Sequence, residues 1–211
     1  MNPHTSILLR VSVIAAVLAT AGDLLLLWNA NAYIPDLALA SPPIYTLFLG
    51  HYLGITGLAL LGLGYLAIGR EALQLNRKWA MVLIVTAIIF SIVGPLIHGM
   101  TSTFIYFGSA GTQEGNSAME GILESGLLLL PLWGIGLIDM TLLSIACAKL
   151  AGNRWLAVLN PIVLTLIIGS LAMIDDHLAA FGQPASVNIA HLIFLTFVAP
   201  SIVRNIRSRL K

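Results

Sequence analysis

Long apolar stretches separated by short polar breaks are the main pattern in this sequence. Six stretches are about 20 residues or longer, the length that an α-helix needs to cross a hydrocarbon layer of about 30 Å. Glycine and proline mark several of the breaks. The pattern predicts an all-α integral membrane protein, one domain over residues 1–211, with six transmembrane helices at about Ile7–Trp28, Ile44–Ile68, Trp79–Phe107, Ala118–Leu150, Leu156–Phe181 and Val187–Val203.

Proline and glycine also occur inside these predicted helices. Pro95, Pro131 and Pro161 fall in helix interiors, where proline removes a backbone hydrogen bond and favours a kink that neighbouring helices must support. The second helix carries Gly54 and Gly57 among its glycines, and we interpret these as sites of close helix packing.

Composition excludes a soluble protein. The chain is 58% hydrophobic and 9% charged, with a mean hydropathy of +0.96, whereas a soluble domain has about 25% charged residues. The net charge of +1 gives no indication of nucleic-acid binding. Cys147 is the only cysteine, which excludes an intramolecular disulfide and a multi-cysteine metal site.

The basic residues predict the orientation. Cytoplasmic loops near membrane spans accumulate Lys and Arg, and with six spans every basic residue falls on one side. The alternate loops, Asn29–Pro43, Phe107–Ser117 and Gly182–Ser186, contain none. We therefore expect a multi-pass protein of the cell membrane, of the bacterial inner-membrane type, with both termini in the cytoplasm and these ten residues facing it: Arg10, Arg70, Arg77, Lys78, Lys149, Arg154, Arg204, Arg207, Arg209 and Lys211.

Each predicted helix also carries an ionisable residue near its outer end. From the helix rise, these residues lie about 6 to 13 Å below the outer surface. Isolated charges are unfavourable in hydrocarbon, so such groups normally face one another or a wet cavity. The sequence thus predicts one shared polar site formed by Asp23, His51, His98, Glu124, Asp176 and His191.

Mixed imidazole and carboxylate side chains suit a divalent metal. Zinc fits best, with iron or manganese as alternatives. The predicted ligands are His51, His98, His191 and Asp176, with Asp23 as an alternative ligand or a catalytic acid–base group and Glu124 as the general base. The evidence is depth alone, because these residues lack the tight spacing of a helix-borne metal motif.

The leading functional hypothesis is therefore a membrane-embedded, metal-dependent enzyme. It would hydrolyse or isomerise a lipid or isoprenoid-like molecule that enters from the outer leaflet, so membrane lipids and a hydrophobic small molecule are the expected partners. A proton-coupled small-molecule transporter is the alternative, and it predicts polar groups that continue toward the cytoplasmic side. A b-type haem between His51 and His98 and a purely structural polar layer also stay open.

Overall fold

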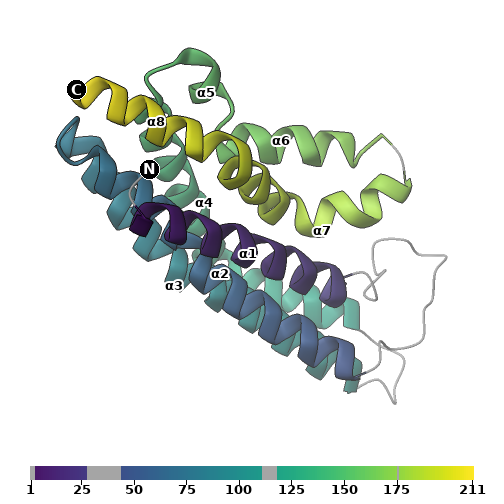
Figure 1. Ribbon diagram of the computed structural model, residues 1–211. Coiled ribbons are helices and arrows are strands. Elements are labelled where there is room, and N and C mark those ends of the chain that lie inside the picture. Colours follow the sequence, from purple (N-terminus) through teal and green to yellow (C-terminus); the bar gives the residue numbers. More distant parts are fainter. Residues whose placement is uncertain (1–2, 28–43, 111–117, 175) are drawn as a thin grey trace.

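The structure is a computed structural model that describes the backbone of residues 3–27, 44–110, 118–174 and 176–211, and the side chains of residues 3–26, 45–103, 129–174 and 185–211. Nearly all of the described chain is helical (Figure 1). The elements are α1 (Pro3–Leu27), α2 (Ile44–Ala72), α3 (Arg77–Ala110), α4 (Ala118–Ala151), α5 (Arg154–Val158), α6 (Pro161–Leu171), α7 (Asp176–Ile193), the π-helical turn η2 (Phe194–Val198) and α8 (Ala199–Leu210).

The prediction of a helical membrane protein is confirmed. Five helices within the described residues are long and apolar enough to cross a membrane. Their spans come from α1, α2, α3, α4 and the continuous α7–η2–α8 segment. The predicted sixth crossing is not established, because α6 has 11 residues and would extend only about 16 Å.

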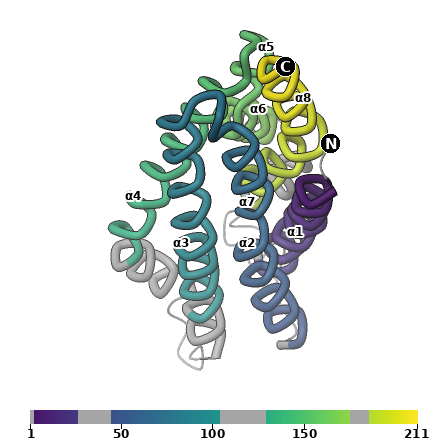
Figure 2. The backbone as a smooth tube through the Cα atoms, turned by 60° about the vertical axis from the view of Figure 1, so that its left-hand side comes forward, coloured from purple at the N-terminus to yellow at the C-terminus, as the bar shows by residue number. Residues whose placement is uncertain are grey.

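Helices that are consecutive in the chain pack side by side. Figure 2 shows α1, α2, α3 and α4 following one another across the bundle, while the α7–η2–α8 segment crosses them with α6 beside α7. The N-terminus and the C-terminus lie at the same end (Figure 1). We call this end the basic end, because Arg70, Arg77, Lys149, Arg154 and the C-terminal tail are located there.

Small residues bring α1 and α2 into close contact. A Cβ atom added at Gly57 would lie 2.4 Å from the backbone nitrogen of Ala19, and one added at Gly22 would lie 2.5 Å from the backbone nitrogen of Gly54. Both contacts are with backbone atoms, which cannot move aside as a flexible side chain can. The two helices therefore form a close pair that depends on glycine at these positions.

The last third of the chain differs from the expected pattern. Residues 156–181 were expected to form one helix, but Asn160 caps a new helix with its side chain, which accepts a bond from the Val163 backbone nitrogen, and Pro161 occupies the first turn. Further on, α7 begins at Asp176 and continues through Gly182 and Pro184, where a break was expected. The final span therefore starts well before Val187, and this moves His191 deeper into the bundle.

Polar contacts fasten α8 to the basic end of the bundle. The Arg207 guanidinium donates from Nε to Glu71 Oε2 at 2.9 Å and from Nη2 to Glu71 Oε1 at 2.5 Å. The Thr5 hydroxyl also bonds Glu71. Asn205 donates to the backbone carbonyl of Ala151 at 3.2 Å. These bonds hold the start of α1 and the ends of α2, α4 and α8 together.

Candidate functional site

A carboxyl group and an imidazole form the centre of the site. Asp23 on α1 and His98 on α3 meet with 3.0 Å between Oδ1 and Nδ1. The His98 side chain is buried and the Asp23 side chain is partly buried, with 6% and 15% of their surfaces exposed. The two residues are far apart in sequence, so the contact depends on how α1 and α3 pack on either side of α2.

Two further groups hold this pair in place. Asn188 on α7 donates from Nδ2 to Asp23 Oδ2 at 2.5 Å, and the other ring nitrogen of His98, Nε2, lies 3.2 Å from the Gly50 backbone carbonyl on α2. The ring rests against Gly54, where an added Cβ would come within 1.9 Å of Nε2. Four elements thus meet at one hydrogen-bonded cluster, and glycine provides the space for the ring.

The bond to Gly50 determines how many protons the pair holds. A carbonyl oxygen can only accept, so His98 Nε2 must carry a proton. The contact between Nδ1 and Asp23 then contains one shared proton, located either on the carboxyl group or on the ring. The pair is a neutral acid with a neutral imidazole in the first case and a carboxylate with an imidazolium in the second. In both forms its net charge is zero, which reduces the unfavourable free energy of burying it.

His51 lies near this pair but has its own partner. Its Nδ1 bonds the Ser102 hydroxyl. Because Ser102 uses its proton to donate to the Gly99 carbonyl at 2.9 Å, His51 must be the donor to Ser102. The bond leaves the lone pair of His51 on Nε2. His51 on α2 and His98 on α3 are therefore neighbours, but each forms its hydrogen bonds with other residues.

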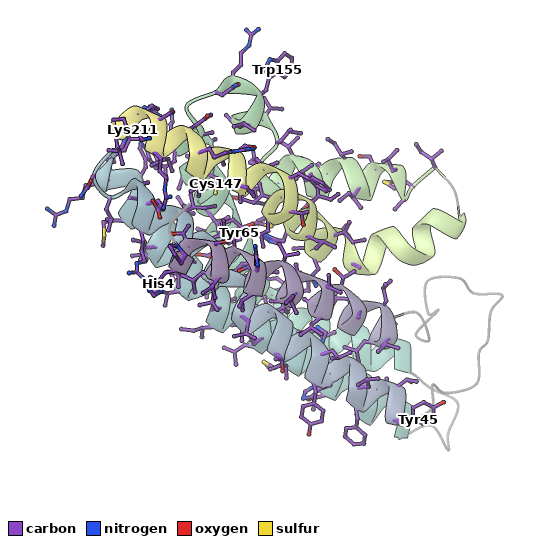
Figure 3. The ribbon with its side chains drawn as sticks, viewed as in Figure 1. His4, Tyr45, Tyr65, Cys147, Trp155 and Lys211 are labelled. Carbon is purple, nitrogen blue, oxygen red and sulfur yellow. The ribbon has the colours of Figure 1, made fainter. Side chains whose placement is uncertain are left out.

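His191 belongs to a second cluster, closer to the basic end. Its Nδ1 lies 2.5 Å from the Tyr65 hydroxyl, and both side chains are 0% exposed. The Tyr65 ring also stacks on Phe194, with 5.5 Å between centroids. By the helix rise, Tyr65 lies about 22 Å along α2 from Gly50, and Figure 3 shows it between Tyr45 at the opposite end and His4 at the basic end. His191 is therefore bonded to Tyr65, whereas the sequence analysis had placed it in one site with Asp23.

Several buried polar atoms have no hydrogen-bond partner among the described residues. They are Nε2 of His191, Oδ1 of Asn188 and both carboxyl oxygens of Asp139. Asn188 and His191 are spaced i, i+3, so they share a face of α7. A buried polar atom without a partner is unfavourable by about 1–3 kcal/mol, and such atoms commonly bind water. The contact face of α7 thus retains unused hydrogen-bonding capacity between the two clusters.

The predicted metal ligands lie only partly among the described side chains. Among the side chains that the structure describes, no three His, Cys, Asp or Glu residues lie where they could hold one metal ion. Both ring nitrogens of His98 are engaged, and His191 is in the other cluster. The three predicted histidine ligands therefore do not meet in one such group within the described residues, and the metal site stays a prediction. The side chains of Glu124 and Asp176 lie outside the described residues, so their predicted roles stay predictions.

Sequence reasoning missed three parts of the site: Asn188, Tyr65 and the Gly50 carbonyl. Asn188 and Tyr65 are uncharged side chains, whereas the predicted site was built only from Asp, Glu and His residues. The spacing of Gly50 and Gly54 could have indicated the Gly50 carbonyl. Glycines spaced i, i+4 leave one face of a helix without side chains, so a ring from a neighbouring helix can reach the backbone there.

Comparisons with known proteins identify a family. No curated protein and no solved structure matches the chain. Residues 1–205 match a family described as "Family of unknown function (DUF6796)". This match covers nearly the whole chain, and the protein therefore belongs to the DUF6796 family.

Proposed function

We propose that this protein is a proton-coupled carrier of a small molecule, in which Asp23 and His98 bind and release the coupling proton. The observation that supports this proposal most strongly is the buried pair itself, which shares one proton between Oδ1 and Nδ1 at 3.0 Å. Ionisable residues inside membrane helices commonly belong to proton relays and transport pathways. A carboxyl–imidazole pair is suited to this role because a proton can pass between a carboxyl oxygen and a ring nitrogen that share a hydrogen bond.

Polar groups that continue toward the basic end favour a carrier over a one-sided enzyme site. Buried polar side chains recur along the contacts of α1 and α2 with the α7–η2–α8 segment. Ser12, for example, donates to the Leu61 carbonyl at 2.7 Å. A pathway across the bundle needs polar groups at several depths, whereas a pocket in one leaflet does not. We call this set the polar seam: Asp23, Asn188, His191, Tyr65, Ser12, Thr5 and Glu71.

Charge balance suggests what the carrier exchanges. With its shared proton the pair is neutral, and without that proton it has a charge of −1. A charge in the hydrocarbon region is unfavourable by at least about 2.5–3.5 kcal/mol, so a sealed bundle favours the neutral pair. A monovalent cation bound beside the deprotonated pair would restore neutrality. We therefore propose exchange of a proton for a small monovalent cation, inorganic or organic.

Reconstituted protein provides the test. Proteoliposomes loaded with a pH-sensitive dye would receive sodium, potassium or a small alkylammonium ion outside, and dye fluorescence would report proton movement. We expect at least one cation to release protons from the lumen in a protein-dependent and saturable way. No cation-dependent proton movement with any of the three would contradict the proposal, as would protons that enter the lumen together with the cation.

A membrane-embedded enzyme is the second candidate. The observation that favours it is the partial exposure of Asp23, whose side chain stays 15% accessible while His98 is 6% accessible. Asp23 could thus exchange a proton with a lipid or isoprenoid-like substrate, with Glu124 as general base. A divalent metal, zinc first, stays part of this candidate. Turnover of a lipid extract by the purified protein, together with stoichiometric metal in elemental analysis, would favour the enzyme over the carrier.

The orientation is part of the same proposal. We propose six crossings, both termini in the cytoplasm and a location in the cell membrane. Two observations support it: the clustering of Lys and Arg at the basic end, and the position of both termini at that end (Figure 1), which requires an even number of crossings.

A further inference from the structure

A pocket opens at the basic end, far from the Asp23–His98 pair. It has a volume of about 370 Å³ and lies where the start of α1, the end of α2 and the end of α8 meet. Its lining combines polar residues, among them Thr5, Arg70 and Glu71, with apolar ones, among them Leu8, Leu73 and Leu210. Figure 3 shows His4 and Lys211 at this end of the molecule.

The charges in this pocket do not cancel. Glu71 is already paired with the Arg207 guanidinium through two hydrogen bonds, at 2.9 and 2.5 Å, and also bonds Thr5. Arg70 lines the pocket, and within the described residues the two ion pairs are His98–Asp23 and Arg207–Glu71. The Arg70 guanidinium therefore stays available as a donor. A planar guanidinium suits a phosphate, which accepts two parallel hydrogen bonds from it.

The apolar lining indicates that the ligand also has acyl chains. Leu8 and Ala67 each lie about one helical turn from the polar residues Thr5 and Arg70, on the side of the apolar parts of α1 and α2. At such a level a phospholipid presents its phosphate to the polar side and its chains to the apolar side. Basic pockets between transmembrane helices bind anionic headgroups, and nearby Lys and Arg attract anionic lipids to the same leaflet.

We propose that this pocket binds the headgroup of one anionic phospholipid from the leaflet at the basic end, with Arg70 on the phosphate. The lipid would bridge α1, α2 and α8, so it would add to the Glu71–Arg207 contact that fastens α8. This proposal does not depend on the carrier function, because it rests on the pocket and its charges alone.

Lipid binding to the purified protein tests the proposal. Native mass spectrometry would count bound phosphatidylglycerol and phosphatidylcholine after incubation with equal amounts of each. We expect the protein to prefer phosphatidylglycerol, and Arg70→Gln to lower its apparent affinity about fivefold, since one basic residue near the surface contributes about 1 kcal/mol. Arg70→Lys keeps the positive charge but loses the planar pair of donors, so its loss of affinity should be smaller than that of Arg70→Gln but measurable.

Arg77→Gln is the matched control, because Arg77 is also an exposed arginine at the basic end but does not line the pocket. It should lower phosphatidylglycerol binding by much less than Arg70→Gln does, because Arg77 lies outside the pocket. An equal loss of affinity in Arg70→Gln and Arg77→Gln would show that only the general surface charge matters, and this would overturn the site. No loss in either variant would overturn it as well. Displacement of the lipid by soluble glycerol phosphate, which has no acyl chains, would also overturn a lipid site.

Discussion

Asp23→Asn should abolish proton coupling and leave the fold nearly unchanged. The introduced amide has the same shape as the carboxyl group. Its oxygen can accept from Asn188, and its NH₂ group can donate to Nδ1 of a neutral His98, so both bonds at 3.0 and 2.5 Å can be replaced. An amide does not titrate, however, and the pair loses its exchangeable proton. We expect cation-dependent proton movement to fall by at least about 100-fold, as when an acid–base group is removed.

Asp23→Leu is the companion variant. Leucine cannot bond His98 or Asn188, so two buried polar groups lose a partner and the free energy of unfolding should fall by about 1–3 kcal/mol. Polar contacts between membrane helices average about 0.6 kcal/mol, so we expect a loss near the lower end of this range. Unfolding in mixed detergent would be compared with proton movement for both variants. If Asp23→Asn kept full activity, the pair would be a structural contact only.

Gly57→Ala should separate α1 from α2. The added methyl group would lie 2.4 Å from the Ala19 backbone nitrogen and 2.6 Å from the Ala15 carbonyl, and these backbone atoms cannot move without shifting the helix. Overpacking of this kind lowers stability by about 1–3 kcal/mol, partly offset by the better helix propensity of alanine, up to about 1 kcal/mol. Detergent unfolding monitored by circular dichroism would measure the change.

Gly134→Ala and Gly94→Ala are controls for this effect. An added Cβ at Gly134 meets no described atom within 4 Å, and at Gly94 the nearest atom is Leu58 Cβ at 3.5 Å, an ordinary contact. Both variants should be neutral or slightly stabilising, because alanine favours the helix. Equal destabilisation at all three positions would show that the α1–α2 contact is not specifically dependent on Gly57.

The general architecture was predictable from the sequence because long apolar runs have few alternatives to helices in a membrane. The last third was less predictable. Asn160 and Pro161 start a helix there, whereas proline in an apolar run was expected to produce only a kink. Gly182 and Pro184, in contrast, do not end α7. Proline has both effects in membrane helices, and surrounding packing decides between them.

The side-chain pairings of the candidate site could not be predicted from the depth of each residue along its helix alone. Helix depth correctly drew attention to Asp23 and His98, which contact each other. It could not show that His51 turns to Ser102 or that His191 turns to Tyr65, because these pairings depend on the rotation of each helix about its axis. The distance of His191 inside its helix was counted from Val187, whereas α7 begins at Asp176.

Solid-state NMR on labelled protein in lipid bilayers tests the central claim, the shared proton of Asp23 and His98, most directly. The structure predicts a through-space correlation between the Asp23 carboxyl carbon and His98 Nδ1, together with a ¹⁵N shift that shows a protonated Nε2 bonded to the Gly50 carbonyl. Absence of that correlation, with His98 Nε2 unprotonated, would contradict the account.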